Sequence, residues 1–99
     1  MANRGINSRL TERRLRRGTE SLVSLRNELS VVEEQVQHFS EEVHDLEIRA
    51  LVSETPLADA ESREAMRHMQ AMTKHRDYLR EAIAELEMRQ DDLLDKLGH

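Results

Sequence analysis

Six arginines within the first seventeen residues have the most distinctive chemistry in this chain. Arginine presents a planar fork of donors that binds phosphate or carboxylate groups in a bidentate manner. Such a cluster predicts docking to nucleic acid, to an anionic surface or to an acidic protein, and the alternative is a tail that only improves solubility. No aromatic residue is interleaved, so any contact with nucleic acid would be to phosphate and would weaken with salt. The basic arm is residues 1–17, and its arginines are Arg4, Arg9, Arg13, Arg14, Arg16 and Arg17.

The other polar residues do not form a pattern typical of an active site. The absence of cysteine excludes disulfides and thiolate metal sites. His68 and His75 are seven residues apart, whereas two histidines that chelate a metal on one helix are usually four apart. With three glycines in all, the chain has no phosphate-cradling loop. We therefore predict no enzyme, no catalytic residues, no metal site and no cofactor.

A second candidate binding surface surrounds the lone proline, Pro56. Apolar residues off the heptad seam lie near this proline together with acidic residues, which predicts an exposed apolar patch with an acidic rim, and such patches often mark partner sites. Packing of the turn against itself is the alternative. The predicted tip patch consists of Ile48, Leu51, Val52, Glu54, Leu57, Asp59, Glu61 and Met66.

Both surfaces depend on two long segments of heptad repeat, written abcdefg, which predict helices with one apolar seam each. In the first segment the a positions are Leu15, Leu22, Leu29, Val36, Val43 and Ala50, and the d positions are Gly18, Leu25, Val32, Phe39, Leu46 and Ser53. In the second the a positions are Ser62, Met69, Arg76, Ile83, Gln90 and Leu97, and the d positions are Ala58, Ala65, Met72, Leu79, Leu86 and Leu93. Neither repeat is interrupted, so a left-handed supercoil is expected.

The two segments predict an all-α fold, an antiparallel two-helix coiled-coil hairpin, with pairing of two hairpins into a four-helix dimer as a further option. We predict the basic arm at 1–17, the first helix at 18–53, the turn at 54–59 and the second helix at 60–97. Thr55 is a candidate cap of the second helix, and Asp59 is the other candidate. Pro56 suits a first helical position.

One register places an a residue opposite a d residue in every apolar layer, namely pairs whose residue numbers sum to 115. Examples are Leu22 with Leu93 and Val43 with Met72. In that register Gly18 lies opposite Leu97, so the basic arm projects beyond the second helix. Two layers are imperfect: Arg76 lies opposite Phe39 and Gln90 opposite Leu25. We interpret them as a snorkelling arginine and a register-fixing amide; contacts with further helices are the alternative. Flanking charges agree with the antiparallel pairing: Arg26 faces Glu87, Glu28 faces Arg89, and Glu33 faces Arg80.

Composition narrows the class of protein. In 99 residues, 35% are charged and 2% aromatic, which suits a helical coiled coil better than a globular core. No apolar run approaches the roughly 20 residues of a membrane span. Nor does an apolar block follow the N-terminus, so we expect a cytoplasmic protein. Arginine far outnumbers lysine, which hints at a bacterial source.

These features predict a non-enzymatic protein-interaction module, a helical hairpin adaptor or regulator that docks on a larger assembly through its tip patch and basic arm. A protein partner is expected. The alternative is a structural homo-oligomeric coiled coil, in which two hairpins pair through the apolar residues off the seam, Val23, Val31, Tyr78, Ala82 and Leu94.

A narrower alternative comes from a resemblance. The stretch Leu57–Glu61, followed by a long helix that contains residues 83–87 (IAELE), is similar to the second arm of the coiled-coil hairpins of Gre-type transcript cleavage factors. The tips of that family are acidic and enter the secondary channel of RNA polymerase. The resemblance implies a transcription factor of this type, in which Asp59 and Glu61 are the tip acids.

Overall fold

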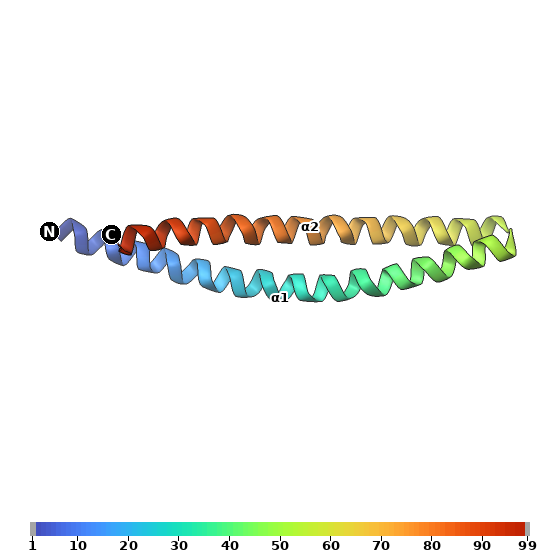
Figure 1. Cartoon of the computed structure of the whole chain (residues 1–99), viewed down its shortest axis with the longest axis horizontal. Helices are drawn as coiled ribbons and strands as arrows, with labels where there is room; N and C mark the ends of the chain where they lie inside the picture. Colours follow the sequence, from blue (N-terminus) through green and yellow to red (C-terminus); the bar gives the residue numbers. More distant parts are fainter. Residues whose placement is uncertain (1, 99) are drawn as a thin grey trace. The chain divides into compact units, whose positions relative to one another are not determined.

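A computed structural model of the chain describes residues 2–98, and the side chains of residue 5 and residues 7–98. Helix α1 spans Ala2–Ser53 and helix α2 spans Pro56–Gly98. No strand occurs between residues 2 and 98. The two helices pack against each other as an all-α helical hairpin, which confirms the predicted fold class (Figure 1).

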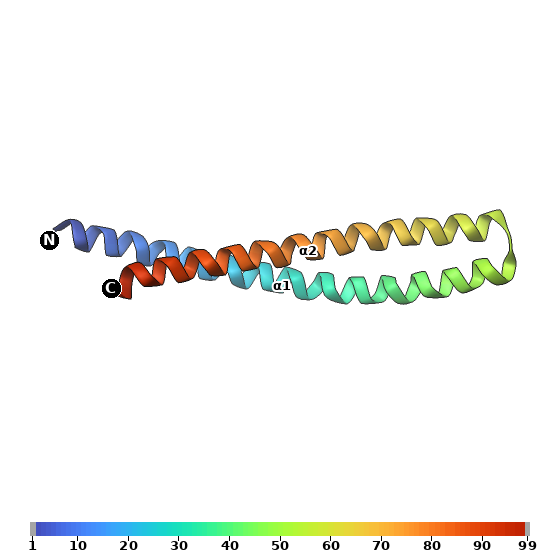
Figure 2. The same ribbon diagram turned by 45° about the horizontal axis from the view of Figure 1, so that its top comes forward.

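The hairpin divides into two compact units, each of which contains a stretch of both helices. Unit 1 combines α1 as far as Glu28 with α2 from Leu79 onward, and unit 2 is Leu29–Tyr78 with the turn. In both views the two helix stretches of unit 2 run side by side into that turn (Figure 2). In unit 1 the N-terminal part of α1 continues past the last residues of α2.

The turn is shorter than predicted, because only Glu54 and Thr55 lie between the helices. Glu54 ends α1 with a left-handed backbone conformation (φ 53°), and its N–H donates to the Ala50 carbonyl at 3.1 Å. This is the αL cap, in which a C-terminal carbonyl is satisfied by the residue just past the helix. Residues 56–59, predicted as turn, instead form the first turn of α2.

Thr55 caps α2, as its position before Pro56 suggested. Its hydroxyl oxygen accepts a hydrogen bond from the Ala58 N–H at 3.2 Å, and its carbonyl accepts one from the Asp59 N–H at 3.1 Å. Pro56 occupies the first helical position, where its missing N–H costs nothing. The beginning of α1 was also misplaced: residues 2–17 of the basic arm are the start of this helix rather than a separate segment.

The seam predicted from the heptads is the buried side of both helices. Every described a and d position from Leu15 to Ala50 and from Ala58 to Leu93 is buried or half-buried. The most fully buried side chain is Leu79 in unit 1, at 1% exposure. In unit 2 the buried side chains are Val32 and Val43.

The predicted register is wrong by one heptad in unit 1. The Gln90 amide nitrogen donates to the Leu15 carbonyl at 2.9 Å and to the Thr19 hydroxyl at 3.3 Å. A Cβ built on Gly18 would overlap the Gln90 side chain. Gln90 therefore lies opposite Gly18, a pair whose numbers sum to 108, and not opposite Leu25. Gln90 is still the polar residue that fixes the register, but it does so opposite Gly18, through its hydrogen bonds to Leu15 and Thr19.

Unit 2 shows the same shift. Phe39 lies against His68, with ring centroids 4.6 Å apart, instead of opposite Arg76. The Arg76 guanidinium pairs with Asp77 at 3.1 Å and the side chain is 25% exposed, in agreement with the interpretation of Arg76 as a snorkelling arginine. The sums 115 and 108 differ by seven, so an a residue meets a d residue in both registers. The apolar pattern alone cannot separate them.

The charge pair between Arg26 and Glu87 is present in unit 1, with Nη2 and Oε1 3.5 Å apart. Both side chains are about half exposed. Its residue numbers sum to 113, a value between the two registers. The pair therefore supports antiparallel packing without choosing a register.

Candidate docking surfaces at the turn and on the basic arm

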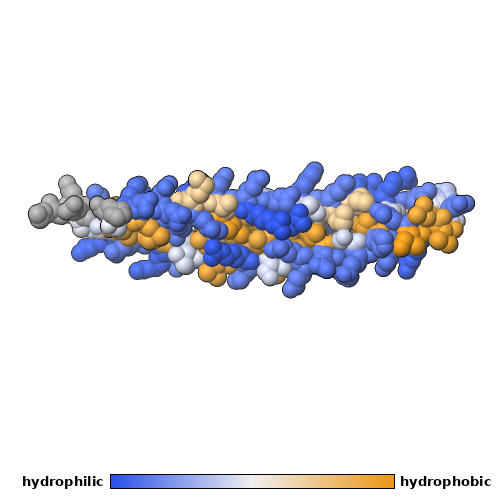
Figure 3. All heavy atoms as spheres, viewed as in Figure 1, coloured by the Kyte–Doolittle hydropathy of each residue, from blue (hydrophilic) through white to orange (hydrophobic). Residues whose placement is uncertain are grey.

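The tip patch forms around the turn because the two-residue connection leaves the last turn of α1 and the first turn of α2 uncovered. Leu51, Val52 and Leu57 are 78%, 80% and 70% exposed, and Ile48 is 48% exposed. All four positions lie off the seam. Orange, hydrophobic atoms gather over the turn in the face shown in Figure 3. Three aliphatic side chains at this exposure form the largest apolar feature of the turn.

The acids of the tip patch are exposed beside these side chains. Glu54 lies in the turn itself, and Asp59 and Glu61 follow in the first turns of α2. Leu51 and Asp59, together with Glu47, line a shallow hollow of about 310 Å³ on the flank of the turn. Met66 differs from the prediction because it is half-buried, so it contributes little to the exposed patch.

The basic arm is helical, and this arranges its arginines on defined sides of α1. Arg9, Arg13, Arg16 and Arg17 fall within about 100° of one another on a helical wheel, on the side away from the seam. Arg14 lies at the edge of the seam. All five side chains are exposed. The side chain of Arg4 lies outside those that the structure describes.

The shifted register also changes the position of the basic arm in unit 1. Leu97 lines a groove with Leu10 and Thr11 rather than lying opposite Gly18. Residues from Leu10 onward therefore lie alongside α2 and do not project beyond it. This end groove is lined by Asn7, Ser8, Leu10, Thr11, Arg14, Lys96 and Leu97.

The end groove is lined mainly by polar side chains, with two leucines and two cationic residues among them. Leu10 and Leu97 are 44% and 36% exposed, and the cationic side chains of the lining are Arg14 and Lys96. The groove lies between residues 7–14 of α1 and the last turn of α2. Sequence reasoning missed it because the predicted register placed Leu97 seven residues away from Leu10 and Thr11.

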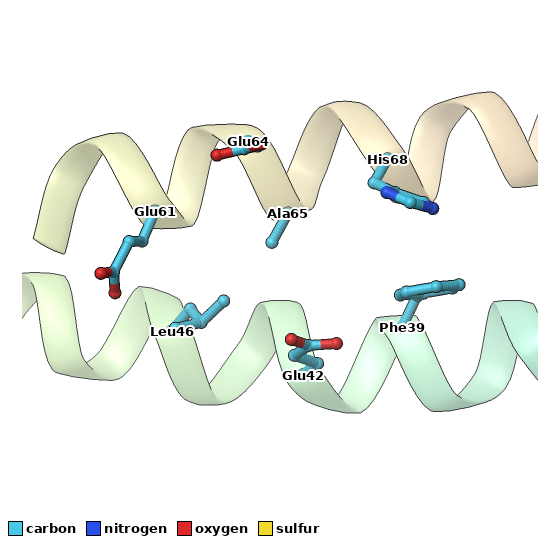
Figure 4. A pocket seen from close by; sticks show the side chains of 7 residues that line it. All are labelled: Phe39, Glu42, Leu46, Glu61, Glu64, Ala65 and His68. Atoms are coloured by element: carbon cyan, nitrogen blue, oxygen red, sulfur yellow. The ribbon is translucent and has the colours of Figure 1, made fainter.

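A further hollow lies on the flank of unit 2, where Phe39, Glu42 and Leu46 of α1 face Glu61, Ala65 and His68 of α2 (Figure 4). Its volume is about 320 Å³, and Glu64 completes the lining. The small side chain of Ala65 leaves this space open beside the stacked rings of Phe39 and His68. Sequence reasoning missed this hollow too, because it paired Phe39 with Arg76.

Within the described part of the chain, no group of three or more histidine, aspartate and glutamate side chains is placed to hold a metal ion. Between residues 2 and 98, neither helix is long and apolar enough to cross a membrane. Comparisons with protein-family models, with curated proteins and with solved structures find no match to this chain. The docking surfaces are thus described by their own chemistry alone.

Proposed function

We propose that this chain is a non-enzymatic protein-interaction module, a helical hairpin adaptor that docks on a larger assembly through its tip patch and its basic arm. The observation that carries the proposal is the exposure of Leu51, Val52 and Leu57 around the turn, at 70–80%. A two-residue turn can be closed by polar residues, as Thr55 shows by capping α2. The turn does not need three water-exposed aliphatic residues to form, whereas burial of these residues against a partner would be favourable.

The size of the tip patch indicates that it does not act alone. Full burial of one aliphatic side chain contributes about 1.5–3 kcal/mol, so three contribute roughly 5–9 kcal/mol. Association costs an estimated 4–15 kcal/mol in lost translational and rotational freedom. The tip patch by itself therefore supports weak binding. A second contact on the same partner would raise the overall affinity without any change at the tip.

The basic arm supplies a candidate for that second contact. The side chains of Arg9, Arg13 and Arg16 point away from the seam, so their guanidinium groups are available to carboxylates or phosphates on a partner. Exposed charge pairs are individually worth about 0–1 kcal/mol. The arm therefore serves orientation and rate of encounter, and the tip patch supplies most of the affinity.

Affinity capture from an extract of the native host tests this division of roles. We expect Leu51→Glu and Leu57→Glu to lose the proteins that the unchanged chain captures, because a buried carboxylate at the tip opposes docking. Met88→Glu is the matched control, since Met88 is another exposed apolar residue, 68% exposed, that belongs neither to the tip patch nor to the surface through which two hairpins could pair. Circular dichroism verifies that all variants remain helical.

The arm is tested by point changes, because deletion of residues 1–17 would also remove Leu15 from the seam. Arg9→Glu with Arg13→Glu should weaken capture at low salt, and the difference from the unchanged chain should shrink at high salt. Capture of the same proteins by the Leu51→Glu variant, the Arg9→Glu/Arg13→Glu variant and the unchanged chain would refute the proposed function.

A further inference from the structure

The tip patch and the end groove have opposite chemistry. The tip patch presents Leu51, Val52 and Leu57, with the carboxylates of Glu54 and Glu61 among its rim. The end groove is lined by Leu10 and Leu97 together with polar residues, of which Arg14 and Lys96 are cationic. The tip patch thus combines exposed aliphatic side chains with carboxylates, and the groove combines two leucines with two cations.

We propose that the tip patch of one copy of this chain binds the end groove of a second copy. This inference rests on the proposed function in taking the tip patch as a docking surface, and it names a second copy as an occupant of that surface. The apolar side chains of the tip would lie against Leu10 and Leu97. Carboxylates of the rim would meet Arg14 and Lys96, whose guanidinium and ammonium groups are suited to them.

Charge selects this pairing over contact between two tips. Two tip patches brought together would place Glu54, Asp59 and Glu61 of one copy against the same residues of the other. Like charges facing each other across an interface disfavour association and suppress the wrong partner. The acidic rim thus favours a basic counterpart, and the charged residues that line the end groove, Arg14 and Lys96, are both cationic.

A second acidic surface of the chain could also bind the cations of the end groove in another copy, and it serves as a control. Asp91, Asp92 and Asp95 are exposed on the outer side of α2 in unit 1. Exposed charge pairs without apolar contact hold copies together weakly. The tip patch is favoured because it combines its carboxylates with three highly exposed aliphatic side chains.

The predicted contact is heterologous, because the two surfaces that meet are different. Copies joined in this way form an open chain, or close into a ring in which every tip patch and end groove is occupied. The mean mass should therefore rise with concentration above the 11.6 kDa of one chain. A four-helix dimer of hairpins would instead associate independently of the tip patch and the end groove. The small contact predicts weak, rapidly reversible association.

Sedimentation velocity of the purified full chain, over a range of concentrations at low salt, tests the inference. We expect the mean sedimentation coefficient of the unchanged chain to rise with concentration. The tip variant Glu54→Lys/Glu61→Lys and the groove variant Arg14→Glu/Lys96→Glu should each weaken association by about tenfold or more. An equimolar mixture of the two should associate again, because the unchanged tip of one fits the unchanged groove of the other.

The control is Asp91→Lys/Asp92→Lys, which reverses two charges in unit 1 and should leave association as it is. Rescue in the mixture, with no effect of the control, supports the inference. A chain that stays at 11.6 kDa at every concentration overturns it. So does association that is unchanged in the tip and groove variants, that responds to the control, or that is not restored by mixing.

The failure of this inference differs from the failure of the proposed function. If self-association is absent while Leu51→Glu still loses captured proteins, the inference is wrong and the adaptor function stands. If mixing restores self-association while capture does not depend on Leu51, the inference stands and the adaptor function is wrong.

Discussion

The seams of units 1 and 2 differ in the side chains that α2 contributes to them. In unit 1 these are large aliphatic residues, among them Leu79 and Ile83, and one amide, Gln90. In unit 2 the seam of α2 is lined by Ala58, Ser62, Ala65, Met69, Met72 and Arg76. The buried residues of α2, Leu79, Ile83 and Gln90, all belong to unit 1. The hollows beside Phe39 and beside Leu51 lie in unit 2, and the end groove lies in unit 1.

The difference lies in the size of the side chains that occupy the same heptad positions in the two units. Large side chains bury more apolar surface and hold the helices of unit 1 together. Small side chains bury less, and methionine adapts readily to a changed surrounding. We therefore expect the α2 side of the seam to contribute less stability in unit 2, which carries the tip patch, although Val32 and Val43 of α1 are buried there. Regions that bind partners are often drawn from the less stable parts of a protein.

The largest expected effect comes from shortening one seam residue in each unit. Leu79→Ala should lower the free energy of unfolding by about 3 kcal/mol, because it leaves a cavity at the most buried side chain of the chain. Met69→Ala, at a half-buried position of unit 2, should cost about 1 kcal/mol. Thermal and urea unfolding followed by circular dichroism measures both. Equal losses would remove the contrast between the two seams.

The polar layer of unit 1 should show the next largest effect, as a coupling between Gly18 and Gln90. Gly18→Ala should cost about 1 kcal/mol, because the Gln90 amide must leave the Leu15 carbonyl and the Thr19 hydroxyl. In a Gln90→Ala background the same change should stabilise by about 1 kcal/mol, since alanine is the better helix former and the space is then free. If the double-mutant cycle shows no coupling, the contact between Gly18 and Gln90 is contradicted.

The turn of unit 2 should respond with opposite signs at its two residues. Thr55→Ala should lower stability by about 1 kcal/mol, because it removes the hydroxyl that accepts the Ala58 N–H. Glu54→Gly should raise stability by about 0.5–1 kcal/mol, because glycine adopts the observed positive φ without strain. Urea titration of the two variants tests this. A loss of stability in Glu54→Gly would argue against the left-handed cap.

The smallest effect is expected from the ion pair of unit 1. Arg26 and Glu87 are about half exposed and 3.5 Å apart, so their coupling should be about 0.3 kcal/mol. A double-mutant cycle to alanine at low salt measures it, and salt of about 1 M should abolish it. A coupling several times larger would mean that exposed charges, and not the seam, determine the stability of unit 1.

The residues predicted the helices, the seam and the cap, but not the register. Periodicity of the apolar residues is sufficient for the seam, and Thr55 before Pro56 marks the start of α2. The register needed a second signal, because every shift by one heptad keeps a opposite d. That signal is present: Gly18 has no side chain, so the long side chain of Gln90 fits opposite it, where a Cβ on residue 18 would overlap the Gln90 amide.

The tip patch could be predicted because it follows from the turn alone. Leu51, Val52 and Leu57 lie off the seam and next to Pro56, so any tight connection exposes them. The end groove could not be predicted, because it joins residues about ninety positions apart in the sequence. Its existence depends on the register, which places Leu97 beside Leu10.

Cysteine cross-linking tests that register most directly, because the unchanged chain contains no cysteine. Two double variants share Gln90→Cys and combine it with Gly18→Cys or with Leu25→Cys. A disulfide requires Cα atoms about 4.4–6.8 Å apart. Oxidised in dilute solution and read by mass spectrometry, the variant with Gly18→Cys should close a disulfide within one chain, and the variant with Leu25→Cys should not. Closure with Leu25→Cys and none with Gly18→Cys would contradict the hairpin described here and the end groove that follows from it.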